Sequence, residues 1–434
     1  MIKYLFNQAW LQLKQQPLLT VVSVFGTALT ICLIMVMVMQ HQIKVIPFAP
    51  ESNRARLLHV KWVSLERKVG EEYKVWSNGP LGYKAATACF KDLKSAEDVS
   101  IHSIIYRPMQ IKRPLGAGKS VDVKQTDASF FKIFDFAFID GKPFMNADSD
   151  AGLPVAVVSE SVAKSLFDTA AASGKEVLIN DAPYRIVGVV KDVSSLASTA
   201  YAQVWIPYLS TDITTSDQFS WVDGNLGMFS VVILAKDKKD FDAIREESSR
   251  KLATHNASMG AYRIFFRGEP DDQLTMTQHK WSYEAPDMQG YFRNLFIFAL
   301  ILLLVPAINL SSMTQSRLRQ RVAEIGVRRS FGATRGAIIG QIIAENLVLT
   351  LVAGFVGLLL CFTFASIWGS SLFAKAQLVT LNIAPAVEWQ MLFNLSTFIY
   401  ALLFSLLLNV LSSGIPAWKA SKISIVQALT GKTH

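Results

Sequence analysis

The sequence has few charged residues and very few cysteines. Charged side chains make up 18% of the 434 residues, against roughly 25% in soluble domains, whereas hydrophobic residues reach 51%. This composition excludes a disordered chain. Cys32, Cys89 and Cys361 cannot build a disulfide framework, and two of them lie in apolar runs. Because the chain still holds 43 basic and 34 acidic residues, we expect a membrane protein with a large water-exposed part.

Motifs of catalysis and metal binding are also missing. The six histidines are scattered, without a His-Glu-x-x-His helix, and no Cys-x-x-Cys pair or Gly-x-Ser-x-Gly elbow is present. The segment 116–120 ends like a phosphate-binding loop, but Arg113 replaces the first glycine of that motif. We interpret the segment as a hairpin turn. We therefore expect no catalytic residue, no cofactor and no metal site in this chain, unless distant ligands converge.

Four stretches are apolar and long enough, at about 20 residues, to cross a bilayer as helices. The first is too long for a signal peptide and lacks a cleavage site, so we expect it to be retained. The predicted transmembrane helices are residues 17–40, 291–316, 336–366 and 389–414.

The short segments at one end of these helices are strongly basic. They carry eleven basic residues and one acidic residue, which places them in the cytoplasm by the positive-inside rule. Both termini and the loop 317–335 are thus expected inside, and the segments 41–290 and 367–388 outside. The basic residues are Lys3, Lys14, Arg317, Arg319, Arg321, Arg328, Arg329, Arg335, Lys419, Lys422 and Lys432.

The ends of the chain carry smaller signals. Apolar residues in 1–16 follow helical spacing, which favours an amphipathic helix on the cytoplasmic surface over a simple extension of the first span. At the other end, residues 415–434 form a cytoplasmic tail. In the third span, Gly336, Gly340 and Ala344 recur every four residues and predict a face for close helix packing.

The long outer segment reads as an α+β domain with short strands. Ser159 can cap a helix that ends at Phe167, and Asp240 can cap one that ends near Ala253. A stalk helix at 273–293 would be interrupted by Pro286 and Gly290. The predicted strands are 155–158, 176–179, 184–190, 204–206 and 229–234.

The loop 317–335 predicts a short amphipathic helix. Leu318, Val322 and Ile325 form an apolar stripe that could enter a partner's groove or pack on the adjoining spans. Beside it, Glu324 can pair with Arg321 or Arg328. Gly332 is placed to end the helix, and Thr334 to cap the next one. On spacing alone, a loop that only sets topology is an equally good interpretation.

The run from Arg321 to Thr334 resembles the signature of the FtsX/MacB superfamily of ABC transporter permeases, which reads R-x-x-E-I-G-x-R-[RK]-[AS]-x-G-A-[ST]. Glu345 matches an acidic residue that the family carries early in the third span. Residues 415–423 match its C-terminal tail, although Ile425 and Gln427 depart from it. The outer segment resembles the MacB-type periplasmic core at 127–131, 141–144, 157–160, 166–167, 174–177 and 186–192.

The resemblance implies four transmembrane helices, with a large α+β extracytoplasmic domain inserted between the first two. It implies a bacterial inner-membrane protein that works as a homodimer, or as a heterodimer with a related permease. A separate ATPase would bind ATP and magnesium, and an adaptor protein could join; no nucleic acid is expected. The residues implied in ATPase coupling are Arg317, Leu318, Arg321, Val322, Glu324, Ile325, Gly326, Arg328, Arg329, Gly332 and Ala333; those in helix packing are Gly336, Gly340, Ala344 and Glu345; and those in the tail are Pro416, Lys419, Ala420 and Lys422.

Three functions remain within this resemblance. The first is a permease for efflux or extrusion of peptides, antibiotics, lipids or lipoproteins, driven by mechanotransmission from the cytoplasmic ATPase. The second is a signalling permease that activates a cell-wall hydrolase, and the third is a sensor subunit for a two-component system. The length and pattern of the outer domain favour the first. Neighbouring genes would separate them, since an adaptor gene indicates efflux, a hydrolase gene signalling, and a kinase pair sensing.

Overall fold

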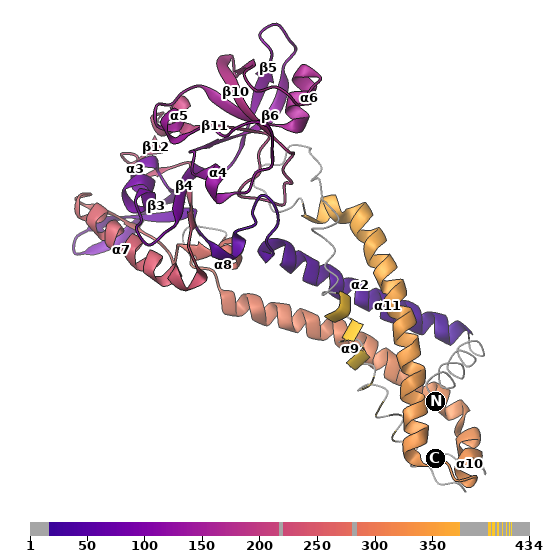
Figure 1. Cartoon of the computed structure of the whole chain (residues 1–434). Coiled ribbons are helices and arrows are strands. Elements are labelled where there is room, and N and C mark those ends of the chain that lie inside the picture. Colours follow the sequence, from indigo (N-terminus) through magenta and orange to yellow (C-terminus); the bar gives the residue numbers. More distant parts are fainter. Residues whose placement is uncertain are drawn as a thin grey trace. The chain divides into compact units, whose positions relative to one another are not determined.

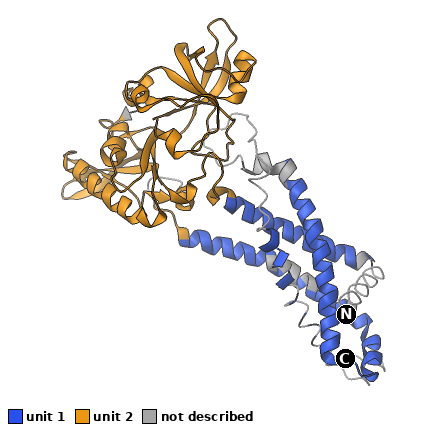
Figure 2. Ribbon diagram, viewed as in Figure 1, with its two compact units in different colours: residues 1–42, 289–372, 388–434 blue, residues 43–288, 373–387 orange. Residues whose placement is uncertain are grey.

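The computed structural model describes residues 17–216, 220–279 and 284–373, and single positions or short pieces between 398 and 418. The chain divides into two compact units (Figure 2), one of residues 1–42, 289–372 and 388–434 and the other of residues 43–288 and 373–387. The predicted surface helix 1–16 lies outside the described residues. Most of the predicted loop 367–388 and of the predicted fourth span also falls outside them.

The first unit contains most of three long helices (Figure 1), α2 (Pro17–Val45), α9 (Met288–Gln320) and α11 (Arg335–Phe373), and the short helix α10 (Val322–Ser330). Among the described residues, the segments Thr20–Val45 and Arg335–Phe364 are long and apolar enough to cross a membrane. They correspond to the first and third predicted spans. The second predicted span lies within α9, whose apolar part Met288–Leu302 is shorter.

Helices α2 and α11 approach each other closely. Ile31, Cys32 and Met35 of α2 are buried in one apolar cluster with Cys361 of α11. A Cβ atom at Gly357 would lie 2.8 Å from the Ala28 carbonyl oxygen, so only glycine fits at this contact. The helices are therefore packed through a small residue that the sequence pattern did not single out.

The second, outer unit contains sixteen strands among the described residues. All five predicted strands are confirmed, as β8, β9, β10, β11 and β14. The strands are β1 (Leu57–Val60), β2 (Trp62–Val69), β3 (Glu72–Pro80), β4 (Asp98–Ser103), β5 (Arg107–Lys112), β6 (Lys119–Thr126), β7 (Phe138–Gly141), β8 (Val155–Ser159), β9 (Glu176–Ile179), β10 (Ala182–Val190), β11 (Val204–Pro207), β12 (Ser220–Trp221), β13 (Leu226–Gly227), β14 (Phe229–Leu234), β15 (Tyr262–Phe265) and β16 (Asp271–Asp272).

Six of these strands form a closed ring, in the order β11-β8-β10-β9-β5-β6. The ring closes because β6 pairs in parallel with β11, with Val123 opposite Val204. Side chains such as Val158 and Ile186 form its buried core. The hairpin interpretation of residues 116–120 is confirmed, since β5 and β6 pair as an antiparallel hairpin with Met109 opposite Val121.

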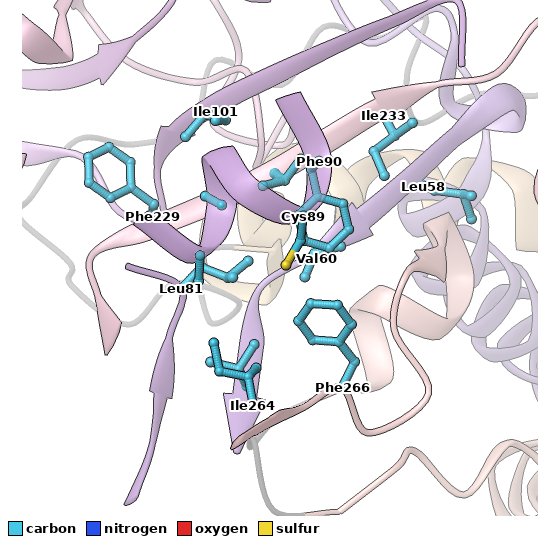
Figure 3. Close-up of a cluster of buried hydrophobic side chains, with 14 of the residues drawn as sticks. Leu58, Val60, Leu81, Cys89, Phe90, Ile101, Phe229, Ile233, Ile264 and Phe266 are labelled. Carbon is cyan, nitrogen blue, oxygen red and sulfur yellow. The ribbon is translucent and has the colours of Figure 1, made fainter. Parts of the chain in front are cut away.

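Strand β6 also pairs with β4, and the sheet continues through β14 and β1 to β16. Phe90, Phe229 and Phe266 are buried against this half (Figure 3). Helix α7 (Phe241–Ala257) adds Phe241 and Ile244 to the same core. A three-stranded sheet, β15-β2-β3, completes the unit. The other helices are α3 (Tyr83–Ala86), α4 (Phe130–Ile133), α5 (Asn146–Asp150), α6 (Glu160–Phe167) and α8 (Gln273–Gln278).

Two helix boundaries differ from expectation. Helix α6 begins and ends as predicted, although the side chain of Ser159 makes no capping hydrogen bond. Helix α7 runs to Ala257, and its first turn follows a short 3-10 turn whose cap is Asp237. The side chain of Asp240 makes no capping hydrogen bond. In the predicted stalk, Pro286 precedes α9, whereas Gly290 lies inside this helix and does not interrupt it. One glycine lowers the stability of a helix by only about 1 kcal/mol, and a helix of 33 residues can contain it.

Candidate functional site

The candidate site is the corner where α9, α10 and α11 meet. Helix α9 ends at Gln320, and Arg321 stands between α9 and α10 with a non-helical backbone. The backbone N–H of Arg321 donates to the Leu318 carbonyl at 3.1 Å, and the N–H of Ile325 donates to the Arg321 carbonyl at 3.0 Å. These two backbone hydrogen bonds continue across the turn at Arg321.

The apolar stripe of this corner packs on the chain's own helix α11. Leu318 and Ile325 are buried together with Ile338 and Ile342 of α11, and Val322 is half-buried. The expectation that this stripe is free to enter a partner's groove is wrong, and the alternative, contact with an adjoining span, is correct. The physical reason is that α10 is short and amphipathic, so α11 offers the nearest apolar surface for its buried face.

Charged side chains hold α10 to α11 on the neighbouring face. Glu324 accepts from Arg321 Nε at 3.0 Å and from Arg328 Nη2 at 2.6 Å, as the sequence predicted. Arg321 Nη1 also lies 3.1 Å from Glu345 Oε2, and Arg328 Nη1 donates to Gln341 Oε1 at 2.8 Å. The hydrogen bond from Arg321 is the main cause that lowers the pKa of Glu324. Both arginines thereby bridge α10 and α11.

The turn after α10 has the capping geometry that its sequence predicts. Gly332 has a φ of +93°, and its N–H donates to the Arg329 carbonyl, while the N–H of Ala333 donates to the Arg328 carbonyl. These two bonds form a Schellman motif, which requires a left-handed residue at the glycine position. The Thr334 hydroxyl then accepts from the Ala337 N–H at 3.2 Å and caps α11.

Two large apolar side chains face outward from this braced corner. Val327 is 44% exposed and Phe331 is 87% exposed, and they stand four residues apart at the end of α10. Sequence reasoning missed both, because they occupy variable positions of the family signature. The available signal was that they are the large apolar residues of the segment 322–331 that remain once Val322 and Ile325 are assigned to the stripe.

The remaining predicted site residues are divided between buried and open positions. Gly326 is buried in α10, and Arg317 lies in the last turn of α9. A Cβ atom at Gly336 or Gly340 would meet no described atom within 4 Å, while Ala344 is half-buried. Their role in packing between subunits stays a prediction. In the tail, Pro416 is helical and buried, and Lys419, Ala420 and Lys422 lie outside the described residues.

A histidine and two carboxylates do converge in the outer unit. His279 Nδ1 lies 2.6 Å from Asp271 Oδ2 and 3.5 Å from Glu269 Oε1, and all three residues are buried. Burial, followed by the charge of Asp271, raises the pKa of Glu269 well above its usual value. Glu269 also accepts from the backbone N–H groups of Lys61 and Trp62, whereas His279 Nε2 is buried without a hydrogen-bond partner among the described residues. The expectation of no metal site stays a prediction.

Family comparisons cover most of the chain. Residues 20–251 match the MacB-like periplasmic core domain, and residues 296–425 match the FtsX-like permease C-terminal domain. The uncharacterized ABC transporter permease YknZ of Bacillus subtilis is 27% identical over 291 residues, which is 67% of this chain and 64% of YknZ. The pyoverdine export ATP-binding/permease protein PvdT of Pseudomonas aeruginosa is 27% identical over 309 residues, which is 70% of this chain and 42% of PvdT.

Among solved structures, the periplasmic region of MacB from Actinobacillus actinomycetemcomitans matches 51% of this chain and 92% of its own length, with 16% identity and a TM-score of 0.34. The chain spans less than two thirds of the length of the two curated relatives. The first family model alone spans more than half of the chain, and the second covers the helices that form the α9–α11 corner. The chain therefore belongs to the MacB- and FtsX-like family of ABC transporter permeases.

Proposed function

We propose that this chain is the permease subunit of a MacB/FtsX-type ABC transporter, and that it couples ATP hydrolysis by a separate cytoplasmic ATPase to movement of its outer unit. It resides in the bacterial inner membrane with both termini in the cytoplasm. It works as a homodimer or with a related permease. ATP and magnesium are bound by the ATPase, and an adaptor protein is a further partner. Membership of the permease family supports this assignment.

The observation that carries the proposal is the exposed pair Val327 and Phe331 on a braced helix. Apolar side chains at i and i+4 on one helix are the anchors by which helices bind in grooves. Arg321 and Arg328 tie this helix to Glu345 and Gln341 of α11. A force that the ATPase exerts on Phe331 is therefore transmitted to α11 through these contacts.

The direction of transport is proposed from the relatives. PvdT is named for pyoverdine export, and a similar protein of Salmonella typhi, MacB, for macrolide export. We propose that this chain likewise serves efflux or extrusion, with peptides, antibiotics, lipids or lipoproteins as substrate classes. Purification from the native host tests the adaptor, because the adaptor should then be recovered with the chain.

The decisive experiment uses the double variant Val327→Ser, Phe331→Ser. The tagged chain is purified from its own host, and the co-purifying ATPase activity is measured in nanodiscs. The matched control is Leu115→Ser, which removes a fully exposed leucine of the outer unit. We expect both variants to express normally and only the first to lose at least 90% of the recovered ATPase activity. Equal recovery from both variants would show that α10 does not bind the ATPase.

A further inference from the structure

The C-terminal end of α2, from Ile43 onward, belongs to the outer unit and is held by buried side chains of that unit. The last carbonyl groups of a helix have no partner within the helix and need other donors. Here Arg54 Nη1 donates to the Ile43 carbonyl at 2.6 Å and to the Ile46 carbonyl at 3.1 Å. Gln273 Nε2 donates to the Lys44 carbonyl at 3.1 Å. Two side chains thus bind three carbonyl groups at the point where α2 ends.

Arg54 is itself fixed from several sides. It is 2% exposed, its Nε lies 2.7 Å from Glu51 Oε2, and its guanidinium lies over the Phe48 ring at 4.1 Å. Its remaining nitrogen, Nη2, donates to the Leu196 carbonyl at 3.1 Å. One guanidinium therefore binds the end of α2 and a segment 142 positions away in the chain.

The partner carboxylate binds the same distant segment. Glu51 Oε1 accepts from the backbone N–H of Thr199 at 2.8 Å and of Ala200 at 2.9 Å. Lys124 Nζ of β6 donates to the Thr199 carbonyl at 2.6 Å. Residues 196–200 are separated from β11 by three residues, and β11 is the strand that closes the six-stranded ring. The end of α2 and the entry to β11 are thus joined through two buried, oppositely charged side chains.

The attraction between the two charges does not by itself account for this arrangement. A buried ion pair can be replaced by apolar side chains of similar size at little or no cost, because desolvation offsets the attraction. Apolar side chains would fill the space but could not bind carbonyl groups on one side and amide groups on the other. What the charged pair adds is a directional link between two backbone segments.

We propose that Glu51, Arg54 and Gln273, here called the α2 clasp, form the joint through which a displacement of α2 reaches β11 and the ring of the outer unit. This inference rests on the proposed function, in which the ATPase moves the membrane helices. The three residues act as positioning residues, since they hold backbone segments and need not contact a substrate. Residues 196–200 are the segment that first responds.

The test is hydrogen–deuterium exchange of the full chain with its co-purified ATPase in nanodiscs, with and without ATP. The variant is Glu51→Gln, Arg54→Met, which removes both members of the ion pair together, and the amide oxygen introduced at position 51 can still accept from Thr199 and Ala200. The matched control is Glu160→Gln, Lys164→Met, which removes a surface ion pair of 2.6 Å in α6. Two peptides are followed, one covering α10 and one covering residues 194–207.

In the wild-type chain and in the control, ATP should change exchange in both peptides. In the clasp variant, the change in α10 should persist, while the change in 194–207 should fall at least threefold. If the clasp variant keeps the full ATP-dependent change of exchange in 194–207, the proposal that the α2 clasp is the joint is wrong. If α10 does not respond in the wild-type chain, the proposed function fails at its first step and the clasp inference fails with it.

A second variant covers the case in which the double variant does not fold, as judged by a lost unfolding transition. Gln273→Leu removes only the bond to the Lys44 carbonyl and the contact with His59. It should reduce the ATP-dependent change in 194–207 by about half while leaving α10 unaffected. An unchanged response in this variant would likewise contradict the proposal.

Discussion

Arg321 and Glu345 stand 24 positions apart in the chain and form an ion pair of 3.1 Å that joins the α9–α10 corner to the third turn of α11. Arg321 also binds Glu324, so one guanidinium holds two carboxylates on two helices. Both Arg321 and Glu345 are half-buried, whereas Glu324 is exposed. The Glu345 contact is therefore the less screened of the two and should contribute more to the rigidity of the corner.

We expect Glu345→Ala to loosen this corner more than Glu324→Ala. Loss of Glu345 removes bonds from both Arg321 and Gln341, whereas the exposed Glu324 pairs are worth roughly 0–1 kcal/mol each. Amide exchange of residues 321–332 should accelerate at least fivefold in Glu345→Ala and less than twofold in Glu324→Ala. Equal acceleration in the two variants would contradict this ranking.

Gly332 should tolerate asparagine but not leucine. Its φ of +93° lies where residues with branched or bulky side chains are strained, while asparagine adopts left-handed conformations at little cost. Gly332→Leu should disrupt the Schellman turn and lower ATPase recovery at least tenfold, with normal expression. Gly332→Asn is the control and should keep more than half of the recovery. Similar losses in both would show that space, and not backbone conformation, matters at this position.

Substitutions at two glycines of α11, Gly357 and Gly340, should have different effects on stability. A side chain at Gly357 would clash with the Ala28 carbonyl, so Gly357→Leu should lower the thermal midpoint of the full chain in detergent by several degrees. Gly340→Leu should leave that midpoint unchanged, because its Cβ would point into open space among the described residues. If Gly340 packs between subunits, crosslinked dimer should still be lost in Gly340→Leu. Recovery of the wild-type amount of crosslinked dimer from Gly340→Leu would contradict the predicted packing face.

The predicted topology can be checked with one pair of cysteine variants. Ser173 of the outer unit and Ser330 of α10 are both exposed. The native cysteines are buried, and burial raises the pKa of Cys89 to about 12, so they should react slowly. Ser173→Cys should react with an impermeant maleimide in intact spheroplasts, and Ser330→Cys only after lysis. The opposite pattern would invert the predicted topology.

The buried Lys124 should make the stability of the outer unit depend on pH. Burial lowers its pKa from 10.5 to about 7, an effect that Glu51 opposes and Lys61 reinforces. Between about pH 7 and 10 the unfolded chain then binds more protons at this residue than the folded chain, so stability rises with pH. The slope is at most about 1.4 kcal/mol per pH unit.

The matched comparison is Lys124→Met, which lacks this titration. Thermal unfolding of the full chain in detergent should show the wild-type stability increasing relative to Lys124→Met from pH 7 to pH 9. Parallel pH profiles of the two proteins would refute a depressed pKa for Lys124.

Local patterns predicted much of this molecule correctly. Short runs of β-forming residues identified β9 and β14 to the residue, and short-range spacing identified the Glu324 pairs and the caps at Gly332 and Thr334. Each of these features depends on residues within a few positions of one another. Their physical cause, local β-propensity or helical periodicity, is therefore present in the sequence itself.

Features that depend on distant contacts were not predictable. Nothing in the sequence distinguishes Arg54 from the other charged residues of the outer segment. Its hydrogen bond to the Leu196 carbonyl is visible only in the structure. Gly340 carried the small-residue pattern, but Gly357 makes the close contact, because helix rotation depends on what α2 presents. The sequence correctly placed Leu318 and Ile325 on one apolar stripe. The packing of this stripe against α11 could be known only from the tertiary structure.

The turn between β5 and β6 offers a practical route to studying this protein. Residues 113–118 connect two strands that are paired along most of the hairpin, and Leu115 at the tip is fully exposed. Exposed loop tips are where insertions are tolerated best. An epitope or a small fluorescent domain inserted after Leu115 should leave the ring intact, and would report from the outer unit in living cells without touching α10 or the clasp.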